Sequence, residues 1–324
     1  MDRRKFIKLA ACASVGGLLL PGCLSQAPPR PAPPAANPVQ SALPPHGQSP
    51  QSGSAQSGTG WPDLVIVQGN DAEAMLNRGL DSLGGIGRFV KSGNTVVLKP
   101  NFSVPRLPEE AATTSIALVA AMVKTCLKAG AKEVKVIDYP FTNANICLEK
   151  TGMKNAVNAV GGNVYALNNR QKYFRTVQVN GQVLDEMDFA KDVLDADVFI
   201  NMPILKHHNM AKLTMGMKNM MGLVWDRGFF HATNLHRCIA ELTAYKQPNL
   251  IVMDAIRGIT ANGPMGPGPI REYNQVIFGT DPVAVDAYGA TLFGMKPGEI
   301  DYLRLAAAMG VGQINWEGLN VKKI

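Results

Sequence analysis

The alternation of short β-branched runs with helical segments constrains the fold of this chain more than any other feature. Residues 115–128 carry apolar side chains at helical spacing before Ala129-Gly130, and residues 281–293 place Pro282 in the first turn of a second helix. Continuous apolar strands separated by helices predict an α/β fold with a mostly parallel sheet flanked by helices. The six runs predicted as strands are 64–68, 95–99, 134–138, 198–202, 250–254 and 275–278.

A small β-hairpin insertion is expected at residues 175–184. Asn180-Gly181 separates a run at 175–179 from a shorter one at 182–184. Asn-Gly favours a tight primed turn, because both residues adopt positive φ at low cost. The segment therefore departs from the strand–helix alternation around it.

The first 23 residues resemble a bacterial export signal. Arg3 and Arg4 precede Lys5-Phe6-Ile7-Lys8, and a short apolar run follows at residues 9–20. A twelve-residue helix covers about 18 Å, which is too short for a hydrocarbon core of roughly 30 Å. The order of these residues resembles the twin-arginine type, so the twin-arginine export machinery, which carries folded proteins, is an expected partner.

Leu20-Pro21-Gly22-Cys23 resembles a lipobox, which predicts that Cys23 is lipidated and anchors the chain to a membrane. Proline departs from the usual residue at its position, so simple cleavage and release into the periplasm is the alternative. Residues 24–60 hold 30 Pro, Ser, Ala, Gln or Gly in 37 positions and predict a disordered tether. We expect a periplasmic or extracytoplasmic protein whose folded domain spans residues 61–324.

Charge and cysteine content exclude two classes of function. Residues 61–324 carry a net charge of +3 (27 basic and 24 acidic residues), which does not indicate a nucleic-acid partner. Cys126, Cys147 and Cys238 are the cysteines of this part, and none forms a Cys-x-x-Cys pair. No iron–sulfur cluster is therefore expected.

Polar residues stand where several predicted strands end. Lys99-Pro100-Asn101, Asp138, Asn201 and Asp254 each follow or close an apolar run. Ligands of open parallel sheets bind outside the carboxyl ends of strands, so these residues predict one shared site. The alternative is that Asn, Asp and Pro are simply common where loops start.

The segment "MPILKHHNMAKLTMGMKNMMG" at 202–222 predicts an amphipathic helix. Met210, Met217, Met220 and Met221 share an apolar arc about 100° wide on a helical wheel, which predicts core packing, whereas Met215 falls outside it. The polar face holds lysines and histidines without one acid between residues 203 and 222. Such a face suits an anionic small molecule or metabolite, and an ordinary solvated face is the alternative.

These patterns, together with the glycine-rich loop at 261–269, indicate the candidate site residues. His208 and His231 are candidate proton carriers, and Asp286 is either a third catalytic group or a buried ion-pair partner. A divalent metal would find ligands in Asp138, Asp254, His208 and His231, although no ligand spacing marks such a site. The residues expected to bind the anion are Lys99, Asn101, Lys206, Lys212, Lys218, Asn219 and Gly263.

The order of several motifs resembles one protein family, domain of unknown function 362 (DUF362), over residues 64–312. The carriers are "VVLKPN" at 96–101, "AGAKEVKVIDYP", "NMPILKHH" at 201–208, "GMKNMMG" at 216–222, His231, "VMDAI" at 252–256, "NGPMG" at 262–266 and "GTDPVAVDA" at 279–287. This resemblance implies no settled reaction. Some members add a ferredoxin-like segment, which this chain lacks, so a redox role does not carry over. The front part also resembles the substrate domain of the nickel-dependent lactate racemase family, in fold and not in function.

Two classes of function with a polar cleft remain open from the sequence, and a structural lipoprotein without such a cleft is the third possibility. The first is an exported, membrane-tethered protein with a Lys/His/Asn-lined cleft for an anionic small molecule, acting as a metal-assisted enzyme. The second is a non-catalytic extracytoplasmic binding or assembly protein. A catalytic site should bring His208 or His231 within hydrogen-bond reach of a strand-end aspartate, while a binding groove needs only the lysines.

Overall fold

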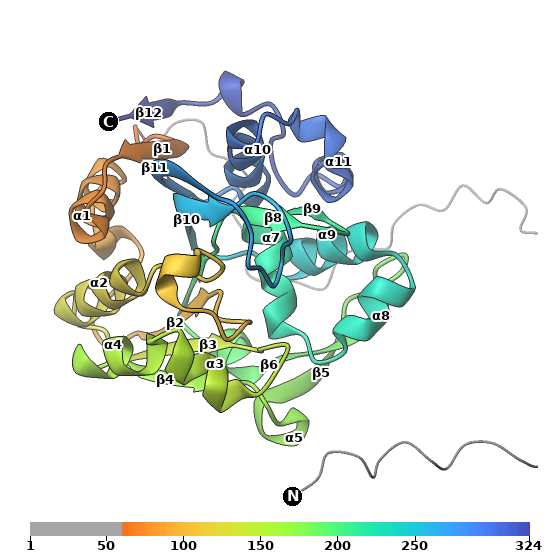
Figure 1. The fold of residues 1–324 in the computed structure, drawn as a ribbon, viewed down its shortest axis with the longest axis horizontal. Coiled ribbons are helices and arrows are strands. Elements are labelled where there is room, and N and C mark those ends of the chain that lie inside the picture. The colour runs from red at the N-terminus through yellow and green to blue at the C-terminus, as the bar shows by residue number, and fades with distance from the viewer. Residues whose placement is uncertain (1–59) are drawn as a thin grey trace, which may run out of the picture. The chain divides into compact units, whose positions relative to one another are not determined.

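The computed structural model describes residues 60–324, in which eight strands form one sheet in the order β12-β1-β11-β10-β7-β2-β3-β4 (Figure 1). The predicted export signal with Arg3, Arg4 and Cys23, and almost all of the predicted tether, lie outside these residues. The strands of the sheet are β1 (Leu64–Gln68), β2 (Thr95–Pro100), β3 (Glu133–Asp138), β4 (Asn163–Ala166), β7 (Val198–Met202), β10 (Leu250–Ile259), β11 (Ile270–Gly279) and β12 (Val321–Lys323).

The sheet is mostly parallel, as predicted. Only the pairs β1–β11 and β10–β11 are antiparallel among the seven neighbouring pairs of this sheet. Successive side chains of a strand point to opposite faces, so Val96 and Leu98 of β2 enter one core cluster and Val97 enters the other. Both faces of the sheet are therefore buried under helices, which explains the continuous apolar runs.

Helices cover the two faces in two groups (Figure 1). Helices α1, α2 and α4 pack on one face, and α9, α10 and α11 belong to the core on the other. The α-helices are α1 (Ala72–Ser82), α2 (Ile116–Lys128), α3 (Ala144–Lys150), α4 (Met153–Ala159), α5 (Arg170–Tyr173), α6 (Lys191–Asp195), α7 (Gly216–Asn219), α8 (Arg227–Ala232), α9 (Leu235–Tyr245), α10 (Pro282–Leu292) and α11 (Asp301–Ala308). The 3-10 helices are η1 (Ile86–Arg88), η2 (Pro108–Glu110), η3 (Met220–Leu223), η4 (Pro297–Glu299) and η5 (Trp316–Gly318).

The strand order places a topological switch point between β2 and β7. From β2 the chain proceeds outward to β3 and β4, whereas β7 lies on the other side of β2 and is followed by β10. Crevices at the carboxyl ends of strands flanking such a point are the usual ligand sites of open α/β sheets. The topology thus singles out the ends of β2, β3 and β7.

The predicted hairpin exists, but its second strand begins later than expected. Strand β5 (Phe174–Gln178) pairs antiparallel with β6 (Glu186–Ala190), so the prediction of a strand at 182–184 is wrong. The Glu241 carboxylate accepts hydrogen bonds from the backbone N–H groups of residues 182–184. Because these donors are satisfied by a side chain, they do not join the ladder and the connection becomes a longer loop.

The predicted amphipathic helix at 202–222 is also wrong. Strands β8 (Lys206–His208) and β9 (Lys212–Thr214) form a small antiparallel hairpin, and only then do α7 and η3 begin. The His208 Nδ1 accepts hydrogen bonds from the backbone N–H groups of Met210 and Ala211, at 3.2 and 3.1 Å. This side chain satisfies the donors of the turn, so a tight turn replaces the helix.

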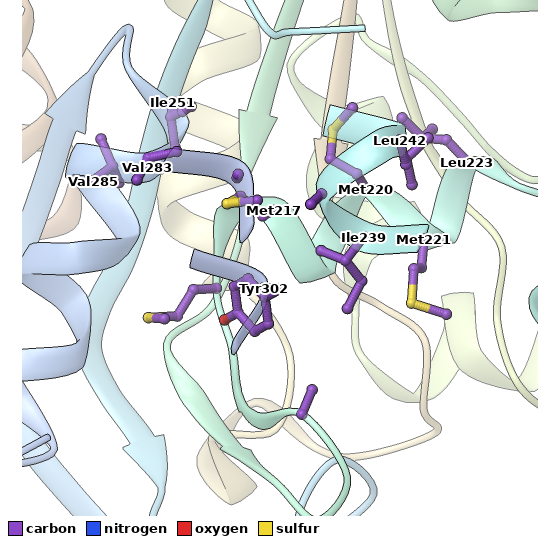
Figure 2. Packing of buried hydrophobic residues seen from close by; sticks show 14 of the residues in the cluster. Met217, Met220, Met221, Leu223, Ile239, Leu242, Ile251, Val283, Val285 and Tyr302 are labelled. Atoms are coloured by element: carbon purple, nitrogen blue, oxygen red, sulfur yellow. The ribbon is translucent and has the colours of Figure 1, made fainter. Parts of the chain in front are cut away.

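Most methionines of this segment pack in the core, but not by helical spacing. Met217, Met220 and Met221 are buried, and Figure 2 shows them among Ile239, Leu242 and Tyr302. Met215 is fully buried although the helical wheel excluded it, and Met210 is 51% exposed although the wheel placed it in the core. The error has one cause, because the hairpin changes which residues face inward.

Within residues 60–324, no helix combines the length and the apolar character that a bilayer-spanning segment needs.

Candidate functional site

A buried ion pair at the carboxyl ends of β2 and β3 lies directly behind the lining of a cavity, and we call this pair with its hydrogen-bond partners the floor. The Lys99 Nζ lies 2.8 Å from Asp138 Oδ1 and donates hydrogen bonds to Asn219 Oδ1 at 2.8 Å and to the Pro100 carbonyl at 2.9 Å. Asp138 also accepts hydrogen bonds from the Ser103 Oγ–H and from the backbone N–H groups of residues 102 and 139. Both charged groups are therefore fully partnered, which a buried pair requires.

Asparagine amides tie the floor to β7 and to α7. The Asn219 Nδ2 donates to the Lys99 carbonyl at 3.1 Å and to Asn201 Oδ1 at 2.8 Å. The Asn101 Nδ2 donates to Asn219 Oδ1 at 3.1 Å, and the Asn201 Nδ2 donates to the carbonyl of Gly216, the first residue of α7, at 2.8 Å. The structure thus brings together the polar ends of three neighbouring strands.

The wall of the cavity carries positive charge and hydrogen-bond donors. Lys206 donates to the Pro264 carbonyl at 2.9 Å, to Asn101 Oδ1 at 3.4 Å and to the Ala112 carbonyl. The cavity is lined by Asn101, Ser103, Phe141, Lys206, His208, Thr214, Lys218, Asn219, Met221, Gly222, Arg227 and Pro264.

Lys218 differs from the other lysines of the cavity because it has no partner. Its side chain is only 6% exposed, and its ammonium group makes no hydrogen bond or ion pair with any residue from 60 to 324. The nearby Thr214 Oγ1 is buried and also lacks a hydrogen-bond partner within those residues. Unpartnered buried polar atoms are rare in folded proteins, so the Thr214 Oγ1, beside the Lys218 side chain in the lining, is consistent with a place where a ligand would supply the missing partner.

His208 is a neutral hydrogen-bond donor in this cavity. Its Nδ1 accepts two backbone N–H groups, which places the ring proton on Nε2. Burial, followed by the positive charges of Lys218 and Lys206, lowers the pKa of His208 to about 2. The neighbouring His231 of α8 is exposed, and its ring lies 6.5 Å from that of His208, centroid to centroid.

Arg227 was not among the residues predicted from the sequence. Its guanidinium donates to the carbonyls of Tyr139 and Pro140 at 2.7 and 3.1 Å, and it lies 3.9 Å from the centre of the Tyr139 ring. These contacts hold the start of α8 against the end of β3. In the sequence, Arg227 stands out only because residues 206–237 contain a single acid, Asp226. No pattern in the sequence indicated Thr214 as a site residue.

The electrostatic balance of the cavity is positive. Its lining holds three basic side chains (Lys206, Lys218 and Arg227) and no acidic one, and the Lys99–Asp138 ion pair lies behind it. Burial lowers the pKa of both Lys206 and Lys218 to about 7. Such shifts report that the folded protein leaves these ammonium groups short of negative partners.

Three predicted site residues lie elsewhere. The exposed Lys212 donates to the Glu299 carbonyl at 2.7 Å. The buried Asp254 accepts from Ser115 N–H at 2.7 Å, and burial raises its pKa to about 6. Asp286 accepts from Gly216 and Met217 N–H at 2.6 and 2.9 Å, and burial raises its pKa to about 7. Asp286 thereby anchors the start of α7, which carries Lys218 and Asn219.

Gly263 lies beside the cavity without lining it. Its backbone N–H donates to His207 Nδ1 at 3.0 Å, and the following residue, Pro264, is a lining residue. The position excludes a larger side chain, because a Cβ would lie within 2.6 Å of the His207 carbonyl carbon. The glycine thus allows the 262–267 loop to pack on the β8–β9 hairpin.

The four residues predicted as metal ligands are not brought together as one set. No three His, Cys, Asp or Glu side chains in residues 60–324 are placed to hold an ion. Asp138 is committed to Lys99, and Asp254 to the backbone at the start of α2. The donor set at the cavity, rich in ammonium and N–H groups, fits an anion rather than a cation.

A second hollow of about 280 Å³ lies beside the cavity. Its lining includes Tyr139 and Pro140, whose carbonyls hold Arg227, and several uncharged amide side chains. The lining residues are Tyr139, Pro140, Thr142, Asn143, Ala144, Asn145 and Asn168. It carries no charge of its own.

Comparisons with known proteins agree with the motif order noted above. A family model described as "Domain of unknown function (DUF362)" matches residues 96–291. The thylakoid-associated protein sll1697 of Synechocystis sp. is 28% identical over 246 residues, which are 74% of this chain and 75% of that relative.

Two solved structures show a distant likeness. One is the lactate racemase apoprotein from Thermoanaerobacterium thermosaccharolyticum, with 10% identity, a TM-score of 0.48 and coverage of 70% of this chain and 56% of that one. The other is a protein from Thermotoga maritima, with 13% identity, a TM-score of 0.44 and coverage of 71% and 60%. The chain thus spans somewhat more than half of each structure, and neither likeness carries a functional inference.

Proposed function

The chain belongs to the DUF362 family, and from that premise we propose that its cavity binds the anionic group of a small molecule or metabolite. The family description assigns no reaction, so the proposal rests on the site. One observation carries it: Lys218 is a buried residue that lines the cavity with two further basic residues, and its ammonium group has no partner among the described residues.

An unpaired buried charge is costly, which supports a role in binding. Moving an ammonium group from water into the protein interior costs roughly several kcal/mol, even after the protein has relaxed around it, unless a counter-charge is present. Lys99 shows how the same chain meets this cost, with an aspartate and an asparagine as partners. Lys218 lacks both, so a bound anion would supply what the protein leaves out.

The donors of the wall match an oxyanion. Lys218, Thr214 and His208 all line the cavity, and no described residue accepts a hydrogen bond from their side chains. Charge-assisted hydrogen bonds from ammonium groups to carboxylate or phosphate oxygens are short and strong. A carboxylate or a phosphate is therefore the proposed ligand group.

The histidines support binding more than acid–base catalysis. Neither His208 nor His231 makes a hydrogen bond to Asp138 or Asp254, and the Nδ1 of His208 is already an acceptor for two N–H groups. A ring in this state donates a proton in a hydrogen bond but does not take one up near neutral pH. The non-catalytic binding protein is the better-supported of the two classes left open by the sequence.

We further propose that the chain is exported by the twin-arginine route and held at a membrane by lipidated Cys23, on the periplasmic or extracytoplasmic side. The motifs around Arg3, Arg4 and Cys23 support this, and so does the description of the Synechocystis relative as thylakoid-associated. Fractionation tests it: we expect the chain in the membrane fraction, the Cys23→Ser variant in the soluble extracytoplasmic fraction, and a variant with lysines at both arginines retained in the cytoplasm. Unchanged distribution of both variants would contradict the proposal.

Titration calorimetry with inorganic phosphate, acetate and dicarboxylates tests anion binding. We expect Lys218→Met to weaken binding by about tenfold or more, as for the loss of one charge-assisted hydrogen bond. Lys212→Met is the matched control and should bind normally, because Lys212 lies outside the cavity. Affinity should fall as the pH rises above about 7, where Lys218 loses its proton. Equal affinities of the two variants, or no binding of any anion, would contradict the proposal.

A further inference from the structure

The segments that line the cavity also expose large apolar side chains. Met210, Phe141, Phe229 and Met265 are 51, 43, 41 and 46% exposed. Each of them is a cavity-lining residue or lies within two positions of one. They account for four of the eight large apolar side chains exposed in residues 60–324, and we name these four the apolar rim.

On one side of the cavity, two segments of the rim are joined. His208 lines the cavity, and Met210 follows it in the turn between β8 and β9. Pro264 lines the cavity, and Met265 follows it. The backbone N–H of Asn209 donates to the Gly263 carbonyl at 3.2 Å, so the turn and the loop pack side by side.

On the other side, Arg227 links the remaining two segments. It lines the cavity, and its guanidinium lies 4.7 Å from the centre of the Phe141 ring. Phe229 follows two positions later on α8, whose first turn is capped by the Asp226 carboxylate through the Phe229 N–H. Phe141 therefore has a cation beneath it while nearly half of its side chain faces solvent.

The enclosed space is small, which limits what enters it. About 20 Å³ of it is open to the centre of a water-sized sphere, so the space is narrow. A small anionic head group is the part of a ligand that suits this space, and the rest of a larger ligand remains outside. The part outside then meets the apolar rim.

We infer that the anion is the head group of an amphiphile, a phosphate or carboxylate that carries a hydrocarbon chain at a membrane surface. This inference rests on the proposed anion site and adds the class of ligand. Basic side chains in the lining and exposed apolar side chains on the same segments are complementary to such a molecule, since burying the chain against the rim adds apolar contact to the ionic one. A purely polar metabolite gains nothing from Phe141, Phe229 or the two methionines.

Vesicle co-sedimentation tests the inference on the full chain carrying Cys23→Ser, so that no lipid anchor contributes. Three vesicle types are compared: phosphatidylcholine alone, with phosphatidic acid, and with phosphatidylglycerol. We expect the strongest binding to phosphatidic acid, whose phosphate is a terminal head group. Preference for neither anionic lipid over phosphatidylcholine would overturn the inference, and equal preference for both would reduce it to surface charge attraction and overturn it as well.

Variants separate the head group from the chain. Lys218→Met should weaken binding to phosphatidic acid vesicles by about tenfold or more, and Phe229→Ser by about three- to tenfold. Ile146→Ser is the matched control, because Ile146 is as exposed as Met210 but lies on α3, five positions from the nearest residue that lines the cavity. A loss with Ile146→Ser equal to that with Phe229→Ser would overturn the role of the rim.

Soluble phosphates distinguish this inference from the site on which it rests. Glycerol 3-phosphate should compete with vesicles for the cavity of the unsubstituted protein. This measurement does not depend on whether any variant folds. Binding of glycerol 3-phosphate that depends on Lys218, without preference for phosphatidic acid vesicles, would leave the anion site standing and remove the amphiphile. Absence of both kinds of binding would remove the anion site itself.

Discussion

The floor and the wall of the cavity use the same residue type in opposite ways. Lys99 in the floor is fully buried, paired with Asp138 and hydrogen-bonded to Asn219. Lys218 in the wall is buried almost as deeply but has no partner among the described residues. The charge of the first lysine is balanced by neighbouring residues, whereas no residue from 60 to 324 balances the charge of the second.

This contrast separates structural from binding residues better than burial or charge alone. Asp254 and Asp286 are buried, charged residue types, yet each accepts two backbone N–H groups and so resembles Lys99. An unsatisfied buried group costs stability, and proteins tolerate such costs at sites that serve a ligand. Substitutions in the floor should therefore destabilise the protein, whereas those in the wall should weaken binding.

The largest expected effect is in the floor. Lys99→Met should lower the free energy of unfolding by about 3 to 5 kcal/mol, because it leaves the Asp138 carboxylate buried without its counter-charge. Denaturant unfolding followed by circular dichroism measures this. Lys135→Met removes a partly exposed ion pair with Asp192 and should cost about 1 kcal/mol or less. Similar losses of unfolding free energy in the two variants would contradict the distinction between the floor and the surface.

In the wall, a substitution should change the free energy of unfolding in the opposite direction. Lys218→Met removes an unpaired buried ammonium and should raise the free energy of unfolding of the ligand-free protein by about 1 to 3 kcal/mol. The pKa of Lys218 in the folded protein, about 7, is below its ordinary value, so the wild type gains stability as the pH rises from about 7 toward 10. The advantage of the variant should be complete below pH 7 and shrink above it.

Thermal unfolding, measured in steps of roughly one pH unit between pH 6 and pH 10, checks this. The lowered pKa of Lys218 places the expected change in stability within this range. A destabilised Lys218→Met variant, or an advantage that grows with pH, would show that Lys218 has a partner in the folded chain.

The smallest expected effect concerns the hydroxyl of the wall. Thr214→Val replaces a buried, unpartnered Oγ1 by a methyl group, so stability should change by less than about 1 kcal/mol and anion affinity should fall by about three- to tenfold. Thr243→Val is the control, because its Oγ1 donates to the Ile239 carbonyl at 2.8 Å and its loss should destabilise the protein. If the Thr214→Val variant loses stability but keeps its affinity for the anion, Thr214 does not belong to the anion site.

Much of the sheet could be predicted because its strands are buried on both faces. Strands 64–68 and 198–202 were placed with the bounds that the structure has, and residues 115 and 281 cap the two predicted helices. The polar residues at strand ends were also visible, since parallel strands place their carboxyl ends at one edge. Three of these ends meet in the floor, while Asp254 binds the backbone at the start of α2 instead.

The segment 202–222 shows where sequence reasoning failed and why. Its apolar spacing matches a helix, but one histidine side chain satisfies the turn between β8 and β9 and redirects the chain. Lys212 and Lys218 then separate, so one reaches Glu299 on the surface and the other enters the cavity. A periodic pattern does not record such a contact, because it depends on a single side chain bonding to the backbone nearby.

The sequence by itself determined the fold class, the strand ends and the positive charge of the region, because apolar runs, turn residues and charge are local properties. The tertiary structure alone decided which lysine has a partner. Lys99 meets Asp138 from the next strand and Asn219 from 120 residues away, and Lys218 meets neither. Whether a buried charge has a partner depends on its three-dimensional neighbourhood, and here it distinguishes the proposed binding site from the residues that support it.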